Sequence, residues 1–391
     1  MAQTATSRPW RARCDTPELP FAVTAMLVAL FLFGMLHRTW EPADFIIAGQ
    51  AVTDPAALPT AIPVARDAQG FEGQFFYRLA LNPFTHQTTA YGITLNNPPL
   101  RQQRILYPLL TWLAAFGQPQ FVPALLVYIN FFALCLLGWL GGVYARLLGR
   151  HALWGLLLPL YPGFLMTLRC DLAEVLEVCL LLASLLLLRR ERPARATLLL
   201  VLAVLTKETA LVVALVAALA YGLARRRGRA VPIRWFYFAV PLLIFVVWQT
   251  VLRRVWGEWP VWVDRSGLGV PLLNLARLCG AALRGETPAP VRTCGELLAV
   301  AGFALAVLSQ FRLTAATALE KNAWLAYALL GLALNGQAWV ADWNFLRALS
   351  EFYVLGAIIV IGGKTQLKAI TLAVVVVLWL AQAYRLIAHI L

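Results

Sequence analysis

An acidic residue stands between two glycines at the start of the aromatic sequence FEGQFFYRLA, residues 71–80. Glu72 is the only carboxylate in this stretch, and we expect it in a loop just before a helix begins. There it could take the proton of an acceptor hydroxyl that attacks a sugar anomeric carbon. The alternative is a solvated acid at a helix N-terminus, which the helix dipole favours. Gln74 and Tyr77 of the same stretch are candidate substrate contacts.

Two arginines follow in the sequence NPPLRQQRILYP, residues 97–108. Arg101 and Arg104 are three residues apart, which places them on one face of a helix. Because guanidinium groups match phosphate oxygens bidentately, this pair could hold the phosphate of a lipid-linked substrate. The alternative is an interfacial anchor that contacts ordinary phospholipid headgroups.

Three later clusters also place charges beside apolar segments, where they are expensive and therefore candidates for function. Arg347 could bind a second phosphate, or could pair with Glu351 one turn later. The other clusters could be substrate contacts or interhelical ion pairs, and for Glu177 we favour an ion pair. The three clusters are Arg169, Asp171, Glu174 and Glu177; Lys207 and Glu208; and Asp342, Arg347 and Glu351.

The elements that must position these residues are membrane helices. Of the 391 residues, 61% are hydrophobic and 13% are charged, whereas a soluble domain has about 25% charged residues. Apolar runs that approach the 20 or so residues of a membrane span predict an all-α polytopic protein with about eleven segments in a single domain, 1–391. They lie near 21–37, 121–145, 152–168, 172–188, 196–206, 210–224, 234–252, 295–311, 323–339, 349–363 and 369–386. The fifth and sixth are short and could form a hairpin that does not fully cross.

The net charge of +14 would suggest nucleic acid in a soluble protein. Here it is explained by the excess of Lys and Arg in cytoplasmic loops. Arg8, Arg11 and Arg13 precede the first segment, so we expect a cytoplasmic N-terminus, with Leu391 outside the bacterial inner membrane. The predicted inner side then carries 18 of the 33 basic residues and four of the 19 acidic ones. We expect membrane lipids as partners, and no nucleic acid.

Two long segments remain on the predicted outer side, 38–120 and 253–294. The first is aromatic and therefore expected to be ordered, and its apolar run 105–116 is too short to span, which predicts a membrane-dipping helix. Cys279 and Cys294 lie in the outer region and could form a disulfide. The six cysteines have no metal-site spacing and the first loop has no DxD sequence, so no metal is predicted.

These features together resemble the C-type glycosyltransferases (GT-C). FEGQFFYRLA (71–80) and RILYPL (104–109) are similar to elements of the GPI-anchor mannosyltransferase type and of related bacterial membrane proteins. The hairpin LTKET, 205–209, resembles the GT-C hairpins that carry a basic residue. The resemblance implies a polyprenyl-phosphate sugar as donor, with neither a nucleotide sugar nor another cofactor. The family pattern has Asp at the position of Glu72, and the longer side chain displaces the carboxylate.

The sequence therefore supports a membrane glycosyltransferase that acts with inversion on a glycan, lipid or protein acceptor. Arg101, Arg104, Lys207 or Arg347 would hold the donor phosphate, with Arg169 and Asp171 as further substrate contacts. Glu72 is the favoured base, Asp44 is the second, and loss of activity is the third possibility. A transporter or lipid flippase and a catalytically silent scaffold are the alternative functions, because charges within membrane segments also mark ion and substrate paths.

Overall fold

The computed structural model describes residues 15–228, 233–263, 267–339, 342–363 and 366–388. About 70% of the chain is helical, with almost no sheet, as expected of an all-α membrane protein. Six described helical segments are long and apolar enough to cross a membrane, so the predicted count of about eleven is not confirmed. They contain α2 (Glu18–Leu36), α6 (Val122–Leu147), α10 (Leu211–Arg226), α11 (Phe236–Trp256), α14 (Pro290–Gln310) and α18 (Leu367–Ala388).

Four of the remaining predicted segments are helices that are shorter than a span requires: α8 (Glu174–Arg189), α9 (Pro193–Thr206), α15 (Ala318–Leu332) and α17 (Ser350–Ile361). The segment predicted at 152–168 is broken into a 3-10 helix, Ala152–Leu157, and a short helix α7 (Pro162–Arg169). Pro159 and Pro162 lack the backbone N–H that a continuous helix needs here. The broken segment brings Arg169 and the turn after it back to the end of the bundle.

The centre of the bundle is largely apolar, with a few buried acids in α8 and α17. All residues of α17 are buried, and α8 packs against α9, α6 and α17. Helices that are hydrophobic all round belong in a protein core or a membrane. At Gly141 of α6 the backbone touches Gly155, since a Cβ there would lie 2.3 Å from the Gly155 carbonyl oxygen. By contrast, only 11% of the apolar window of α14 is buried in the protein, so this helix lies at the periphery.

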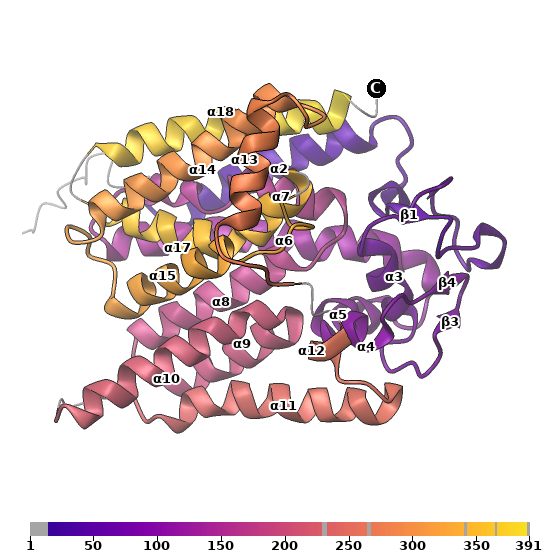
Figure 1. Ribbon diagram of the computed structural model, residues 1–391, viewed down its shortest axis with the longest axis horizontal. Coiled ribbons are helices and arrows are strands. Elements are labelled where there is room, and N and C mark those ends of the chain that lie inside the picture. Colours follow the sequence, from indigo (N-terminus) through magenta and orange to yellow (C-terminus); the bar gives the residue numbers. More distant parts are fainter. Residues whose placement is uncertain (1–14, 229–232, 264–266, 340–341, 364–365, 389–391) are drawn as a thin grey trace, which may run out of the picture.

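The predicted first outer loop is an ordered cap on one end of the bundle, on the right in Figure 1. It contains α3 (Gly73–Leu81), α4 (Pro98–Gln103) and α5 (Leu106–Ala115), the last at the position of the predicted short apolar helix. Two small ladders complete it: β1 (Ala48–Gly49) pairs in parallel with β2 (Val64–Ala65), and β3 (Thr89–Ala90) pairs antiparallel with β4 (Ile93–Thr94). The second predicted outer segment contains α12 (Pro260–Val263) and α13 (Leu273–Leu283), and α16 (Asp342–Ala348) precedes α17.

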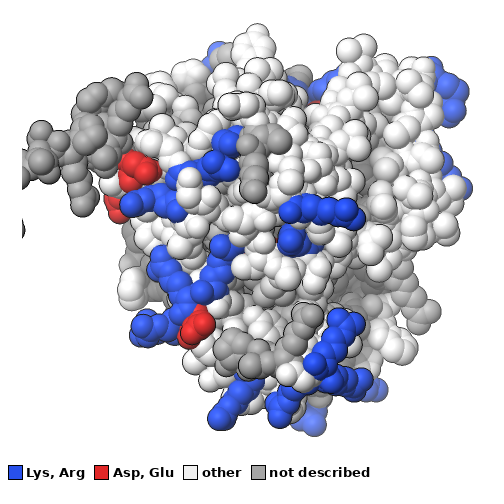
Figure 2. Space-filling view, turned by 90° about the vertical axis from the view of Figure 1, so that its left-hand side faces the viewer, with Lys and Arg blue, Asp and Glu red and all other residues white. Residues whose placement is uncertain are grey.

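The opposite end of the bundle is basic. Figure 2 shows this face with many Lys and Arg side chains and few Asp or Glu. The turn that joins α8 to α9 and the C-terminal end of α10 both carry arginines. Arg8, Arg11, Arg13 and Leu391, on which the predicted orientation partly depends, lie outside the described residues.

The possible disulfide is not formed. Cys279, on α13, and Cys294, on α14, are both free and partly buried. The two helices pack against each other, but the thiols are not joined.

Candidate functional site: a network of ion pairs beneath the first loop

Glu72 immediately precedes α3, and its side chain lies among three arginines. Its carboxylate accepts a hydrogen bond from Arg101 at 2.5 Å and from Arg104 at 3.2 Å, and Arg347 Nη1 lies 3.5 Å away. Gly73 allows this position, because a Cβ there would lie 2.3 Å from the carbonyl oxygen of Cys170 in the turn between α7 and α8. The structure therefore brings together three candidate residues from the sequence, Glu72, Arg101 and Arg104, and adds Arg347 from the far end of the chain.

The network extends through three further carboxylates. Glu208 binds Arg104 through two hydrogen bonds of 2.7 and 3.1 Å. Glu174 lies 3.2 Å from Arg347 and 3.8 Å from the Lys207 ammonium, which in turn lies 3.7 Å from Glu351. Four cations thus face four carboxylates from well-separated parts of the sequence. Arg347 was considered either for a second phosphate or for a pair with Glu351; in the structure it lies beside Glu174 and Glu72, and Glu351 lies beside Lys207.

The three arginines alter the ionisation of Glu72. Burial alone would raise the pKa of its carboxyl group, but Arg104, Arg101 and Arg347 together hold that pKa well below its usual range. Burial likewise opposes the charge on Arg104, yet Glu208 and Glu72 raise its pKa well above the ordinary value. Glu72 is therefore a carboxylate and Arg104 a guanidinium cation at neutral pH.

A small cavity lies directly beside the Glu72 carboxylate. Its volume is about 10 Å³, and Phe75, Phe76 and Leu100 line it together with Glu72, Arg101 and Arg104. This is about the space of one water molecule. The guanidinium of Arg101 lies over the ring of Phe75, 4.6 Å from its centroid. A substrate group would therefore have to displace side chains to enter. The first to move would be Glu72, because its carboxylate contacts the arginines directly.

A second layer of predicted site residues lies beside the network. Arg169 donates to the backbone oxygen of Asp44 at 2.7 Å, and the carboxylate of Asp44 accepts from Thr39 at 2.6 Å. Asp171 is fully buried in the turn after α7, and neither of its oxygens has a hydrogen-bond partner among the described residues. A buried carboxyl group without a partner favours its neutral form. Asp44 thus lies in the predicted first outer loop, whereas Asp171 is buried away from solvent.

Gln74 and Tyr77 hold the first loop together. The Gln74 side-chain oxygen accepts from the backbone N–H of Gly49 and from the Thr53 hydroxyl, while its amide donates to the Gln69 carbonyl at 2.8 Å. Tyr77 is wholly buried. Neither lines the cavity beside Glu72. Their proposed role as substrate contacts remains a prediction, and the structure assigns Gln74 a clear function in folding the loop.

The sequence interpretation did not detect the contact between α11 and α4. Trp248 donates to the Gln103 carbonyl, Gln249 donates to the Gln103 side chain, and Trp256 donates to the Gln102 side chain at 2.6 Å. These bonds hold the short helix that carries Arg101. The amides of Gln102 and Gln103 beside two arginines were the available signal in the sequence.

In the described part of the chain, no three His, Cys, Asp or Glu side chains converge to form a metal site. Comparison with family models, with curated proteins and with solved structures yields no match to this chain.

Proposed function

We propose that this chain is a glycosyltransferase of the bacterial inner membrane that takes a sugar from a polyprenyl-phosphate donor. The finer topology belongs to this proposal: about eleven membrane segments, with the N-terminus in the cytoplasm and the C-terminus outside. The basic face of Figure 2 supports this orientation, because cytoplasmic loops accumulate Lys and Arg. The cap with α3, α4 and α5 then faces the periplasm.

The observation that carries the proposal is the meeting of Arg101, Arg104 and Arg347 at one carboxylate. Three guanidinium groups within hydrogen-bond or ion-pair distance of one point form a site for an anion with several oxygens, such as a phosphate. In the unliganded chain, Glu72 takes the place of that anion. A donor phosphate that binds the arginines would separate them from Glu72 and free its carboxylate.

The reaction follows from these roles. The acceptor oxygen bonds to the anomeric carbon as the bond from that carbon to the donor phosphate oxygen breaks, with inversion. The acceptor proton passes to Glu72, or to Asp44 as the second candidate, and the polyprenyl phosphate leaves on the arginines. Fixed cations stabilise the charge that develops on this leaving group, which is commonly a large contribution to catalysis. Lys207 and Arg347 extend the positive charge toward the α8 side of the site.

Substitution of the two carboxylates tests the assignment. Glu72→Gln removes the base but keeps the shape of the side chain, so we expect transfer in purified membranes to fall by about 10²–10⁴-fold, while the protein still inserts. Asp44→Asn should have a much smaller effect. Transfer that is unchanged in both variants would remove the base assignment. Lipid-linked-sugar profiles of a deletion strain would identify the sugar and acceptor.

Transport is the second candidate, and a specific observation favours it. Glu177 is fully buried in α8, and neither of its oxygens has a hydrogen-bond partner in the described structure. Unpaired acids inside a helix bundle are typical of proton and ion paths. Proteoliposomes distinguish the two functions: a transporter moves a lipid-linked sugar unchanged, whereas the enzyme consumes it.

A further inference from the structure

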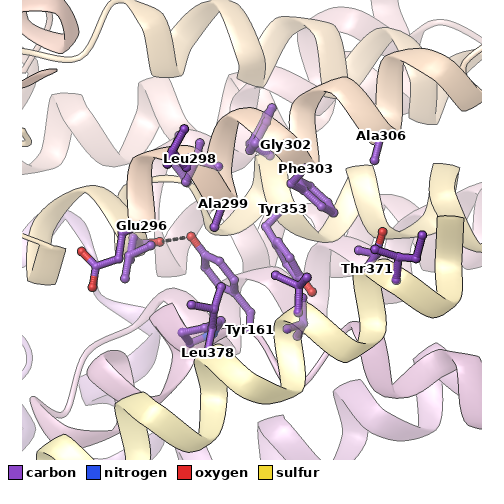
Figure 3. A pocket seen from close by; sticks show the side chains of 18 of the residues that line it. Tyr161, Glu296, Leu298, Ala299, Gly302, Phe303, Ala306, Tyr353, Thr371 and Leu378 are labelled. Atoms are coloured by element: carbon purple, nitrogen blue, oxygen red, sulfur yellow. Dashed lines mark hydrogen bonds between the residues drawn. The ribbon is translucent and has the colours of Figure 1, made fainter. Parts of the chain in front are cut away.

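A second cavity shares no lining residue with the small cavity beside Glu72, and it differs from that cavity in size and composition. It has a volume of about 320 Å³, within the range of small-molecule sites. It runs between α14 and α18, over a floor made by α7 and α17, as Figure 3 shows. Its walls are almost entirely apolar, and we call it the α14–α18 groove.

The groove opens toward the membrane. Helices α14 and α18 are two of the six segments that can cross a bilayer, and the exposed side chains of Leu298, Ile370 and Val374 stand at its edges. The floor is aromatic: Tyr161 stacks on Tyr353, with ring centroids 4.2 Å apart. A site of this kind, within the hydrocarbon layer, suits an alkyl chain.

The groove is closed toward the ion-pair network. The Tyr161 hydroxyl donates to the carbonyl of Leu346 at 2.6 Å, which joins α7 to α16. Leu346 faces the groove, whereas the next residue, Arg347, reaches Glu174 and Glu72 on the other side. An alkyl chain in the groove therefore belongs to a molecule other than one whose phosphate lies on Arg101 and Arg104.

The end of the groove at the start of α14 carries one charge of each sign. Glu296 lines the groove with a side chain that is only 10% exposed, and Figure 3 shows it at one end. Arg292, one turn earlier and 42% exposed, lies 3.8 Å from it. A phosphate suits the exposed arginine and an ammonium suits the more enclosed carboxylate. A headgroup that carries a phosphate and an ammonium supplies a partner for each of the two charges, whereas a purely anionic headgroup supplies none for Glu296.

We infer that the α14–α18 groove binds an aminophospholipid, with one acyl chain in the groove and the ammonium group at Glu296. The bound lipid packs behind α16 and so supports the helix that presents Arg347. This site is separate from the proposed donor site, and its occupancy does not depend on the transfer reaction.

Lipid retention tests this inference directly. The full-length protein is placed in nanodiscs that contain equal amounts of phosphatidylethanolamine and phosphatidylglycerol, is extracted into mild detergent, and its retained lipids are counted by native mass spectrometry. We expect retained phosphatidylethanolamine in the unmodified protein, in excess over phosphatidylglycerol. Glu296→Gln should remove that preference.

A matched pair of substitutions locates the site. Gly302 lines the groove and a Cβ there meets nothing within 4 Å, so Gly302→Leu places its side chain in the groove from an unobstructed Cβ. Exclusion of two methylene groups should lower retention at least about tenfold. Ala301→Leu adds bulk at the exposed neighbouring position, which does not line the groove, and should leave retention unchanged.

Three results would overturn the inference. They are equal retention of the two lipids by the unmodified protein, full retention by Gly302→Leu, and displacement of phosphatidylethanolamine by a polyprenyl phosphate. The last would show that the groove holds the donor chain. Because this experiment measures lipid retention and not sugar transfer, its failure would not count against the proposed enzyme function, which is tested separately.

Discussion

Two ion-paired regions at opposite ends of the bundle use the same residue types in different ways. At the basic end, Arg189 binds Glu320 through two hydrogen bonds of 2.7 and 2.6 Å, and Glu320 is 1% exposed. Glu320 also closes a capping box with Thr317 at the start of α15. At the other end, Glu72 is 25% exposed and is shared by three arginines beside a small cavity.

The difference lies in how fully each carboxylate is enclosed. Glu320 binds one guanidinium group and caps the start of one helix, and both of its carboxylate oxygens accept hydrogen bonds. Glu72 has more cations than a single carboxylate can neutralise, and it is reachable from solvent. A one-to-one buried pair holds helices together, whereas a shared and accessible carboxylate can be exchanged for another anion. This contrast fits a stabilising role for the first pair and the proposed anion site at the second.

The largest expected effect is on stability at the enclosed pair. Glu320→Ala leaves the Arg189 charge buried without its partner, which should lower the free energy of unfolding by about 3–5 kcal/mol. Thermal unfolding in detergent measures this. The double variant Arg189→Met with Glu320→Leu should recover most of the loss, because no charge is left unpaired. A single variant as stable as the unmodified protein would show that the pair is not structural.

The next largest effect is on transfer at the shared site. Arg104→Ala removes the side chain that contacts both Glu72 and Glu208, and we expect the transfer rate to fall about 10²–10³-fold, as for loss of one fixed charge-stabilising group. Arg284→Ala is the control, since Arg284 forms an exposed pair with Glu286 between α13 and α14. Equal transfer by the two variants would remove Arg104 from the proposed anion site.

A smaller effect separates loop structure from substrate contact. Gln74→Ala leaves buried partners such as the Gly49 N–H unsatisfied, so stability should fall by about 1–3 kcal/mol. Because the side chain does not line the cavity, the KM of the folded fraction should stay the same. A large rise in KM without loss of stability would instead support the predicted substrate contact.

The smallest effect is a shift in pH dependence. The three arginines depress the pKa of Glu72, so its carboxylate form is present at neutral pH and is lost only as the pH falls through that low value. The kcat/KM for transfer, which reports the protein before the donor displaces the arginines, should therefore decline only below the ordinary Glu pKa of about 4.3. Arg101→Gln removes one cation and should move this decline to higher pH. An unchanged profile, measured as kcat/KM against pH, would indicate that another group is the base.

Much of the fold follows from local sequence. Nine of the eleven predicted segments correspond to single helices with similar bounds, because runs of apolar residues and prolines act over neighbouring positions. The segment predicted at 323–339 is shifted, since α15 spans Ala318–Leu332. The segment predicted at 152–168 is broken, because it contains Pro159 and Pro162. Whether the shorter helices cross the membrane depends on tilt and packing, which the length of a run does not determine.

The sequence by itself determined that the chain is apolar and helical, that its charges divide unequally along it, and that Glu72, Arg101 and Arg104 are candidate site residues. Only the tertiary structure decided which acids meet which bases. Arg347 reaches Glu72 because α16 folds back beside α7, and Gln74 turns into the loop. Hydropathy and spacing are properties of neighbouring residues, whereas an ion pair depends on helix packing between distant segments. For the same reason, the α14–α18 groove had no signal in the sequence.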